Sequence, residues 1–214
     1  MSIGSNVYLT GLGSRGLNIA AEDTYLRIFI PGKPGNTLVI DQLHFEGNDS
    51  QSTAGYMKVM RVLGRTNVTA AGTAAGTSGF TITTAGFSFG DSTVWGEATD
   101  QLAADDIVAL HLANGTWEWD MVDNVSTTGK ITLDTALTGI ATIGDEVYIF
   151  GSPDKTAHFS HEIPASGAFV VEEDAGMGDE KGDPLMITNY PASSTGTLAA
   201  GIAVLNVQYS YVNK

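Results

Sequence analysis

Residues 107–121 have the sequence IVALHLANGTWEWDM, which carries the clearest β-hairpin pattern of the chain. Val108, Leu110 and Leu112 alternate with other residues, as in a β-strand with one apolar face. Asn114-Gly115 follows, a pair that adopts the positive φ angles of a two-residue type I′ hairpin turn. We therefore expect a β-hairpin here. Because Trp117, Trp119 and Met121 share one face of its second strand, we expect them to supply the local core.

The hairpin lies inside a segment with similar ends. Residues 104–108 (ADDIV) and 144–151 (GDEVYIFG) each carry acidic residues that lead into an apolar strand. A second hairpin is expected to turn at residues 126–129 (STTG). The pattern predicts a small barrel of four or five strands at 104–151, inserted into a larger β domain.

The rest of the chain also favours β-structure. Gly, Ala, Ser and Thr make up 88 of the 214 residues, a composition that disfavours long helices. We expect an all-β fold, with a jelly-roll-like β-sandwich formed by 21–103 and 152–214. In the last strand the apolar residues change from one face to the other, which predicts a β-bulge or a twist near Leu205. Strands are expected at 24–30, 37–46, 55–63, 80–83, 107–112, 116–125, 130–133, 146–150, 157–163, 168–172, 184–188 and 201–212.

Four other segments are less regular. Residues 1–20 are expected to form an N-terminal arm, and the Gly- and Thr-rich residues 66–90 to form a long surface loop or a loosely ordered ribbon. Residues 17–23 could form a short helix. Residues 97–114 could begin as one, although we expect a turn followed by a strand.

Composition excludes several classes of protein. The chain has no Cys, so it has neither a disulfide nor a Cys-ligated metal. No run of apolar residues is long enough to span a membrane, and no secretory signal is expected. A formal charge of −14 argues against nucleic acid. Residues 1–66 hold six basic and five acidic residues, whereas 67–214 hold four basic and nineteen acidic residues. The simpler interpretation is a solvated acidic surface, and the more specific one is docking through the less acidic N-terminal part.

Two glycine motifs resemble enzyme signatures but lack the required context. Residues 11–16 (GLGSRG) match the dinucleotide-binding pattern, yet no acidic residue ends a second strand at the expected distance. Residues 86–90 (GFSFG) match the hydrolase nucleophile elbow, but no helix can follow. We expect neither a cofactor nor catalysis.

No metal site is predicted either. His158 and His161 are three residues apart and would face opposite sides of a strand, although Glu162 leaves a faint metal-binding pattern. His44 and His111 stand alone in strand-like segments. The acidic run at 172–183 has oxygen ligands and glycines suited to calcium, but a solvated loop is the simpler interpretation. We therefore assign no catalytic, cofactor or metal residue.

The segments ADDIVAL (104–110), NGTWEW (114–119) and GDEVYIF (144–150), with the terminal strand 200–211, resemble parts of structural proteins from tailed bacteriophage virions. The resemblance implies a virion protein assembled in the host cytoplasm, most simply a capsid decoration or cement protein. Such a protein would be a homotrimer that contacts the major capsid protein or other virion proteins. The alternative is a tail or adsorption module that binds a host glycan or receptor.

Overall fold

The computed structural model describes residues 7–11, 27–47, 55–70, 79–82, 102–104, 106–126, 129–151, 157–163, 169–173, 177–179, 182–191 and 202–213. The regular structure of these residues is entirely β, as expected, and their strands pair in antiparallel fashion. No helix in this part of the chain is long and apolar enough to cross a membrane.

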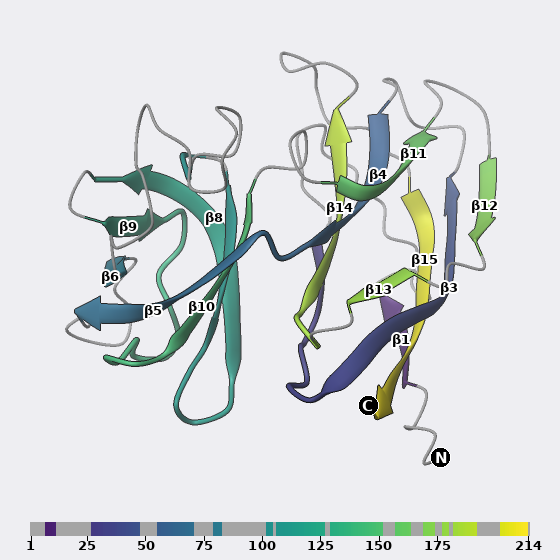
Figure 1. Ribbon diagram of the computed structural model, residues 1–214. Helices are drawn as coiled ribbons and strands as arrows, with labels where there is room; N and C mark the ends of the chain where they lie inside the picture. Colours follow the sequence, from purple (N-terminus) through teal and green to yellow (C-terminus); the bar gives the residue numbers. More distant parts are fainter. Residues whose placement is uncertain are drawn as a thin grey trace. The chain divides into compact units, whose positions relative to one another are not determined.

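The chain divides into two compact units (Figure 1). Unit 1 comprises 1–61 and 157–214, and unit 2 comprises 62–156. Unit 1 contains two sheets. The strands of the first, in spatial order, are β1 (Val7–Gly11), β15 (Ile202–Asn213), β3 (Asn36–Gly47) and β12 (Phe169–Glu173), with β13 (Met177–Asp179) also pairing with β3. The strands of the second are β11 (Ala157–Ile163), β4 (Gly55–Arg61), β14 (Leu185–Pro191) and β2 (Arg27–Ile30).

Both sheets of unit 1 contribute buried apolar side chains. Tyr211 at the end of β15 donates a hydrogen bond from its hydroxyl to the Pro31 carbonyl oxygen (2.5 Å), which links the first sheet to the segment that follows β2. The buried apolar residues of unit 1 are Ile28, Ile30, Leu38, Ile40, Leu43, Met57, Val59, Met60, Leu185, Met186, Ile187, Val207 and Tyr209.

Register shifts explain the apolar pattern of the two longest strands. β15 has a shift between Ile202 and Val204, close to the bulge expected near Leu205. A second shift leaves Asp41 of β3 as an extra residue, because Gln208 pairs with Gln42 while Tyr209 pairs with Ile40. Before the extra residue, the even-numbered side chains of β3, such as Ile40, are buried. After it, the odd-numbered side chain of Leu43 is buried instead.

Unit 2 is a closed six-stranded barrel. In the order in which they pair, its strands are β10 (Glu146–Gly151), β5 (Gly64–Ala70), β6 (Gly79–Ile82), β9 (Lys130–Leu133), β8 (Trp117–Val125) and β7 (Ile107–His111). The barrel therefore begins well before residue 104, where the sequence interpretation placed its start. β5 lies in the stretch that was expected to be a surface loop or a loosely ordered ribbon, whereas β6 matches the strand expected at 80–83. Both strands complete the barrel because Val68, Phe80 and Ile82 turn inward.

The barrel is inserted between two paired strands of unit 1. β4 leads into it and β11 leads out of it, and these two strands are hydrogen-bonded neighbours, with Met60 opposite Ala157. At the barrel's own entrance, the Leu63 amide donates to the Ile149 carbonyl oxygen (2.8 Å). The two ends of the inserted unit thus lie close together in space.

The tryptophans of β8 do not form the barrel core, contrary to expectation. The interior is a single cluster of buried residues that includes Val122 of β8 but neither Trp117, Trp119 nor Met121, which are all half-buried. Leu102, Leu137 and Ala141, from segments outside the six strands, fill the interior instead. Since these residues occupy the core, the inner face of β8 needs few large apolar side chains.

The N-terminal arm is also partly ordered within the chain. β1 pairs over five residues with β15, from Val7 opposite Tyr209 to Gly11 opposite Leu205. Residues 1–6 and 12–20 of the expected arm lie outside the described residues, as does the possible helix at 17–23.

Candidate binding site at one end of the barrel

The hairpin formed by β7 and β8 has a three-residue loop. The Leu112 amide donates to the Thr116 carbonyl oxygen (2.9 Å), and the Gly115 amide donates to that of Leu112 (2.8 Å). Gly115 has a φ of 82°, so it occupies the left-handed position that ends such a loop. The prediction of a two-residue turn at Asn114-Gly115 is therefore wrong, because the loop also includes Ala113. The Asn114 side-chain oxygen instead accepts the Thr116 amide (2.9 Å).

The second hairpin repeats this arrangement. The Ser126 amide donates to the Lys130 carbonyl oxygen and the Gly129 amide to that of Ser126, both at 2.9 Å, and Gly129 has a φ of 79°. The prediction of a turn at 126–129 is confirmed.

Two carboxylates of β8 hold the long segment between β9 and β10. Asp120 is buried, and its Oδ2 accepts the Thr135 amide (2.7 Å) and the Thr135 hydroxyl. Glu118 accepts the amides of Thr138 (2.8 Å) and Gly139 (2.5 Å). These bonds fix the backbone that carries Leu137 and Ala141 into the barrel.

A third carboxylate joins this segment to the first hairpin. Asp145, which is buried, accepts the Ala113 amide through Oδ1 (2.9 Å) and the Thr142 amide through Oδ2 (2.7 Å). The Gly144 amide donates to the Val68 carbonyl oxygen (2.9 Å), and the Val68 amide donates to that of Asp145 (2.9 Å). The hairpin tip and the turn at 142–145 are therefore held at the same end of the barrel.

Aromatic side chains cluster on the outer face of the strands that reach this end. The rings of His111 and Trp117 stack with centroids 4.5 Å apart and planes at 15°. The Trp117 ring lies 5.1 Å from that of Tyr148 on β10. Ala109 of β7 pairs with both Trp119 and Tyr148. Because its side chain is only a methyl group, it leaves room on this face for the Trp117 and Tyr148 rings to approach each other across β7.

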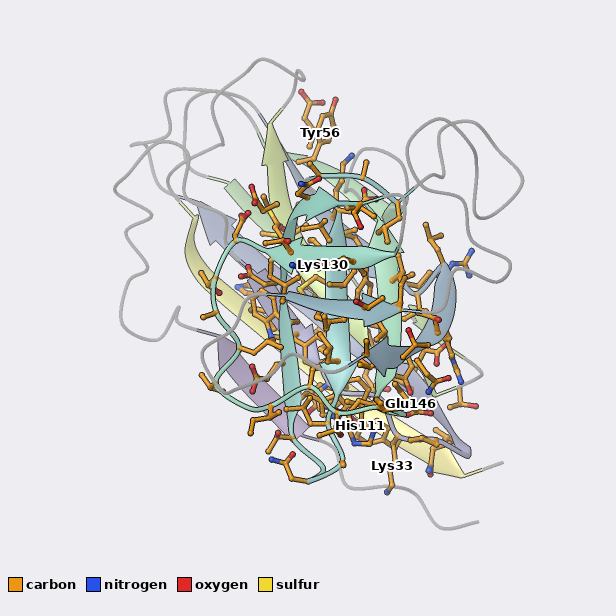
Figure 2. The ribbon with its side chains drawn as sticks, turned by 90° about the vertical axis from the view of Figure 1, so that its left-hand side faces the viewer. Lys33, Tyr56, His111, Lys130 and Glu146 are labelled. Atoms are coloured by element: carbon orange, nitrogen blue, oxygen red, sulfur yellow. The ribbon has the colours of Figure 1, made fainter. Side chains whose placement is uncertain are left out.

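Glu146 connects the cluster to the barrel end (Figure 2). Its Oε2 accepts the Tyr148 hydroxyl (2.9 Å) and lies 3.3 Å from Nδ1 of His111, which donates in the Nδ1–H tautomer. Burial, followed by the bond to Glu146, raises the pKa of Tyr148 to about 12, although the nearby Arg65 opposes the shift. The Arg65 guanidinium carbon lies 5.4 Å from the Tyr148 ring centroid.

The barrel end contains an open pocket of about 420 Å³. One wall is the hairpin end at 111–115, and the other is the segment 143–146. Its lining residues are His111, Leu112, Ala113, Gly115, Ile143, Gly144, Asp145 and Glu146.

The motifs singled out in the sequence do not converge on a catalytic site. Gly11 ends β1, which is antiparallel to β15, whereas a dinucleotide fold requires parallel strands; the rest of that motif, and all of 86–90, lie outside the described residues. His44 is in β3, His111 is in β7, and His158, His161 and Glu162 are in β11. Within the described part of the chain, no group of three or more His, Asp or Glu side chains could hold a metal ion.

The acidic run at 172–183 is not one solvated loop. Glu172 and Glu173 belong to β12 and Asp179 belongs to β13, and both strands pair with β3. Asp183 is buried. Pairing with β3 thus places residues 172–173 and 177–179 in strands, although their composition indicated a loop.

The sequence interpretation missed the pocket. The feature of the sequence that could have indicated the pocket is the pair Ile140 and Ile143, two large apolar residues in the otherwise small and polar segment 138–145 (TGIATIGD). Both isoleucines are exposed.

Comparisons with known proteins identify no family: no family model matches, and no curated protein matches. Among solved structures, the chain is similar to VP17, a capsid protein of bacteriophage P23-77, with 12% identity, a TM-score of 0.21, and 99% of this chain and 97% of that chain covered. A complex of VP16 and VP17, the two major capsid proteins of that phage, matches with 12% identity, a TM-score of 0.22 and 97% of each chain covered. TM-scores this low do not establish a common fold.

Proposed function

We propose that this protein is a structural component of a bacteriophage virion and has no catalytic activity. The observation that supports a structural role is that the carboxylates of the barrel bind backbone amides of the same chain. Asp120, Glu118 and Asp145 accept backbone amides of the barrel's own loops, so they act as scaffold. The virion class is supported by the resemblance of residues 104–110, 114–119, 144–150 and 200–211 to segments of phage structural proteins.

Within the virion, the proposed role is that of a capsid decoration or cement protein that stabilises the head through protein–protein contacts. The two sheets of unit 1 would form a jelly-roll-like sandwich that docks on the shell, and unit 2 would add a second surface. The charge distribution supports docking through residues 1–66, which hold six of the ten basic residues of the chain.

The proposed assembly is a homotrimer at a threefold junction of the shell, because a closed oligomer can match the symmetry of its site. Light scattering of the purified protein would then give three times the chain mass of 22.4 kDa. A monomer or dimer in solution would contradict the trimer.

Cryo-electron microscopy of the parent particle tests the function directly. The expected result is density for two β units on the outer surface of the head, at junctions between capsomers. Density on the tail, together with saturable binding of host glycans, would instead support the adsorption module. Absence of the chain from purified particles would overturn the virion role.

A further inference from the structure

The pocket at the barrel end is built from rigid parts. Asp145 belongs to one wall; it accepts the Ala113 amide of the opposite wall and the Thr142 amide of its own turn. The hairpin loop is closed by its own backbone hydrogen bonds, and the Gly144 amide is bonded to Val68 of β5. A pocket held in this way loses little conformational entropy when it binds a ligand.

Its apolar lining is exposed to water. Ile143 is 73% exposed, the largest value among the exposed large hydrophobic residues of the described chain. An exposed branched side chain on a fixed turn gains nothing for folding, but it offers a preformed apolar contact to a partner.

The polar lining favours a cation. Glu146 is half-exposed, and its contacts with His111 and Tyr148 both use Oε2, so its carboxylate can also accept hydrogen bonds from a bound group. Unit 2 as a whole contains twelve acidic residues and only three basic ones. Of those three, Lys130 lies away from His111 and Glu146 in Figure 2, and Arg65 lies over Tyr148.

We propose that this pocket binds an arginine side chain of a partner protein. The aliphatic stem would lie against Ile143, and the guanidinium group would pair with Glu146 while its flat face meets the His111 imidazole. Arginine suits the site better than lysine, because a planar guanidinium both stacks on rings and forms a directed pair with a carboxylate. A second copy of this acidic unit is disfavoured as partner by charge repulsion. The inference rests on the proposed function only for the identity of that partner.

The experiment titrates the full chain, labelled with ¹⁵N, with N-acetyl-arginine amide. N-acetyl-citrulline amide, which has nearly the same shape without the charge, is the matched control ligand. Saturable shifts are expected for amide signals of 112–115 and 143–146 with the arginine compound, at least tenfold weaker with citrulline. Glu146→Gln should weaken binding about tenfold, which corresponds to about 1.4 kcal/mol.

Two further variants keep the test independent of folding. Asp123→Asn removes the same charge from an exposed position on β8 and should leave binding unchanged. Ile143→Ser changes an exposed side chain and should weaken binding while the rest of the spectrum is preserved. Equal shifts with both ligands, no saturable shift, or equal losses in Glu146→Gln and Asp123→Asn would overturn the proposal. None of these outcomes depends on where the protein lies in a particle, so failure here and failure of the virion role are distinguishable.

Discussion

At the scale of single residues, Asp145 has the most connections at the barrel end. It is buried, and its two oxygens accept the amides of Ala113 and Thr142 as well as the Thr142 hydroxyl (3.0 Å). Hydrogen bonds to a charged acceptor contribute about 1.5–3 kcal/mol each, and a buried amide left without a partner costs a similar amount.

We therefore expect Asp145→Ala to lower the free energy of unfolding by about 3 kcal/mol, measured by urea denaturation. The control is Asp123→Ala, at an exposed position in the same unit, where the change should stay within about 0.5 kcal/mol. Equal stability of the two variants would mean that Asp145 does not hold the two loops together.

The raised pKa of Tyr148 predicts that the stability of the protein depends on pH in the alkaline range. Burial and its bond to Glu146 raise the folded-state pKa to about 12 from the usual 10.0, so between these pH values the unfolded state loses the phenolic proton while the folded state retains it. The unfolded state then binds fewer protons, and stability falls as pH rises through this window. Urea denaturation across the window should show a smaller loss of stability for Tyr148→Phe than for the unchanged protein. An equal loss in both proteins would contradict the assigned shift.

At the scale of elements, alternation of apolar residues predicted most of the strands. β7 and β10 were recognised because Val108, Leu110, Val147 and Ile149 all point into the barrel. β5 was missed because its two buried side chains, Thr66 and Val68, do not form an apolar run. Such a strand is recognisable only once its neighbours, β10 and β6, are in place.

The same limit applies to the orientation of β8 and to the pocket. Alternation placed Trp117 and Trp119 correctly on one face, but it could not tell which face is the interior. That choice depends on Leu137 and Ala141, which fill the barrel from a segment without strand periodicity. The pocket depends on the Asp145 bonds between two separate loops, and a single sequence carries no signal for that contact.

Gly182 determines how two connections of unit 1 pack together. It has a φ of 77°, and its carbonyl oxygen accepts the Lys33 amide (2.9 Å). A Cβ at this position would overlap the carbonyl oxygens of Lys33 and Asn36, so both the backbone angle and the space exclude a side chain.

We expect Gly182→Ala to destabilise the protein by about 3 kcal/mol or more. Gly35→Ala is the matched control, because Gly35 has a similar φ of 81° with open space around its Cβ position. The control should therefore show only the strain, about 1–2 kcal/mol. Thermal unfolding of the two variants measures the difference, and a Gly35 variant at least as unstable as the Gly182 variant would contradict the packing argument.

At the scale of the whole molecule, the chain is a β unit with a second β unit inserted into one of its strand pairs. Each unit buries apolar side chains from its own strands, and the cluster inside the barrel contains only residues between Val68 and Ile149. The insertion interrupts no ladder of unit 1, because β4 and β11 remain paired around it. This arrangement predicts that the two units fold independently.

Excision of the barrel tests that prediction. In one variant, residues 62–156 are replaced by Asn-Gly, so that β4 and β11 are joined by a three-residue loop of Arg61, Asn and Gly. This loop has the length, and the glycine in last place, that the barrel itself uses at 113–115. The second protein is the fragment 62–156, whose entrance is already closed by the bond between the Leu63 amide and the Ile149 carbonyl oxygen. We expect dispersed amide NMR spectra and a cooperative urea transition from both. A barrel fragment without dispersed signals would show that its core requires unit 1, and an unfolded remainder would show that the β4–β11 pair requires the barrel.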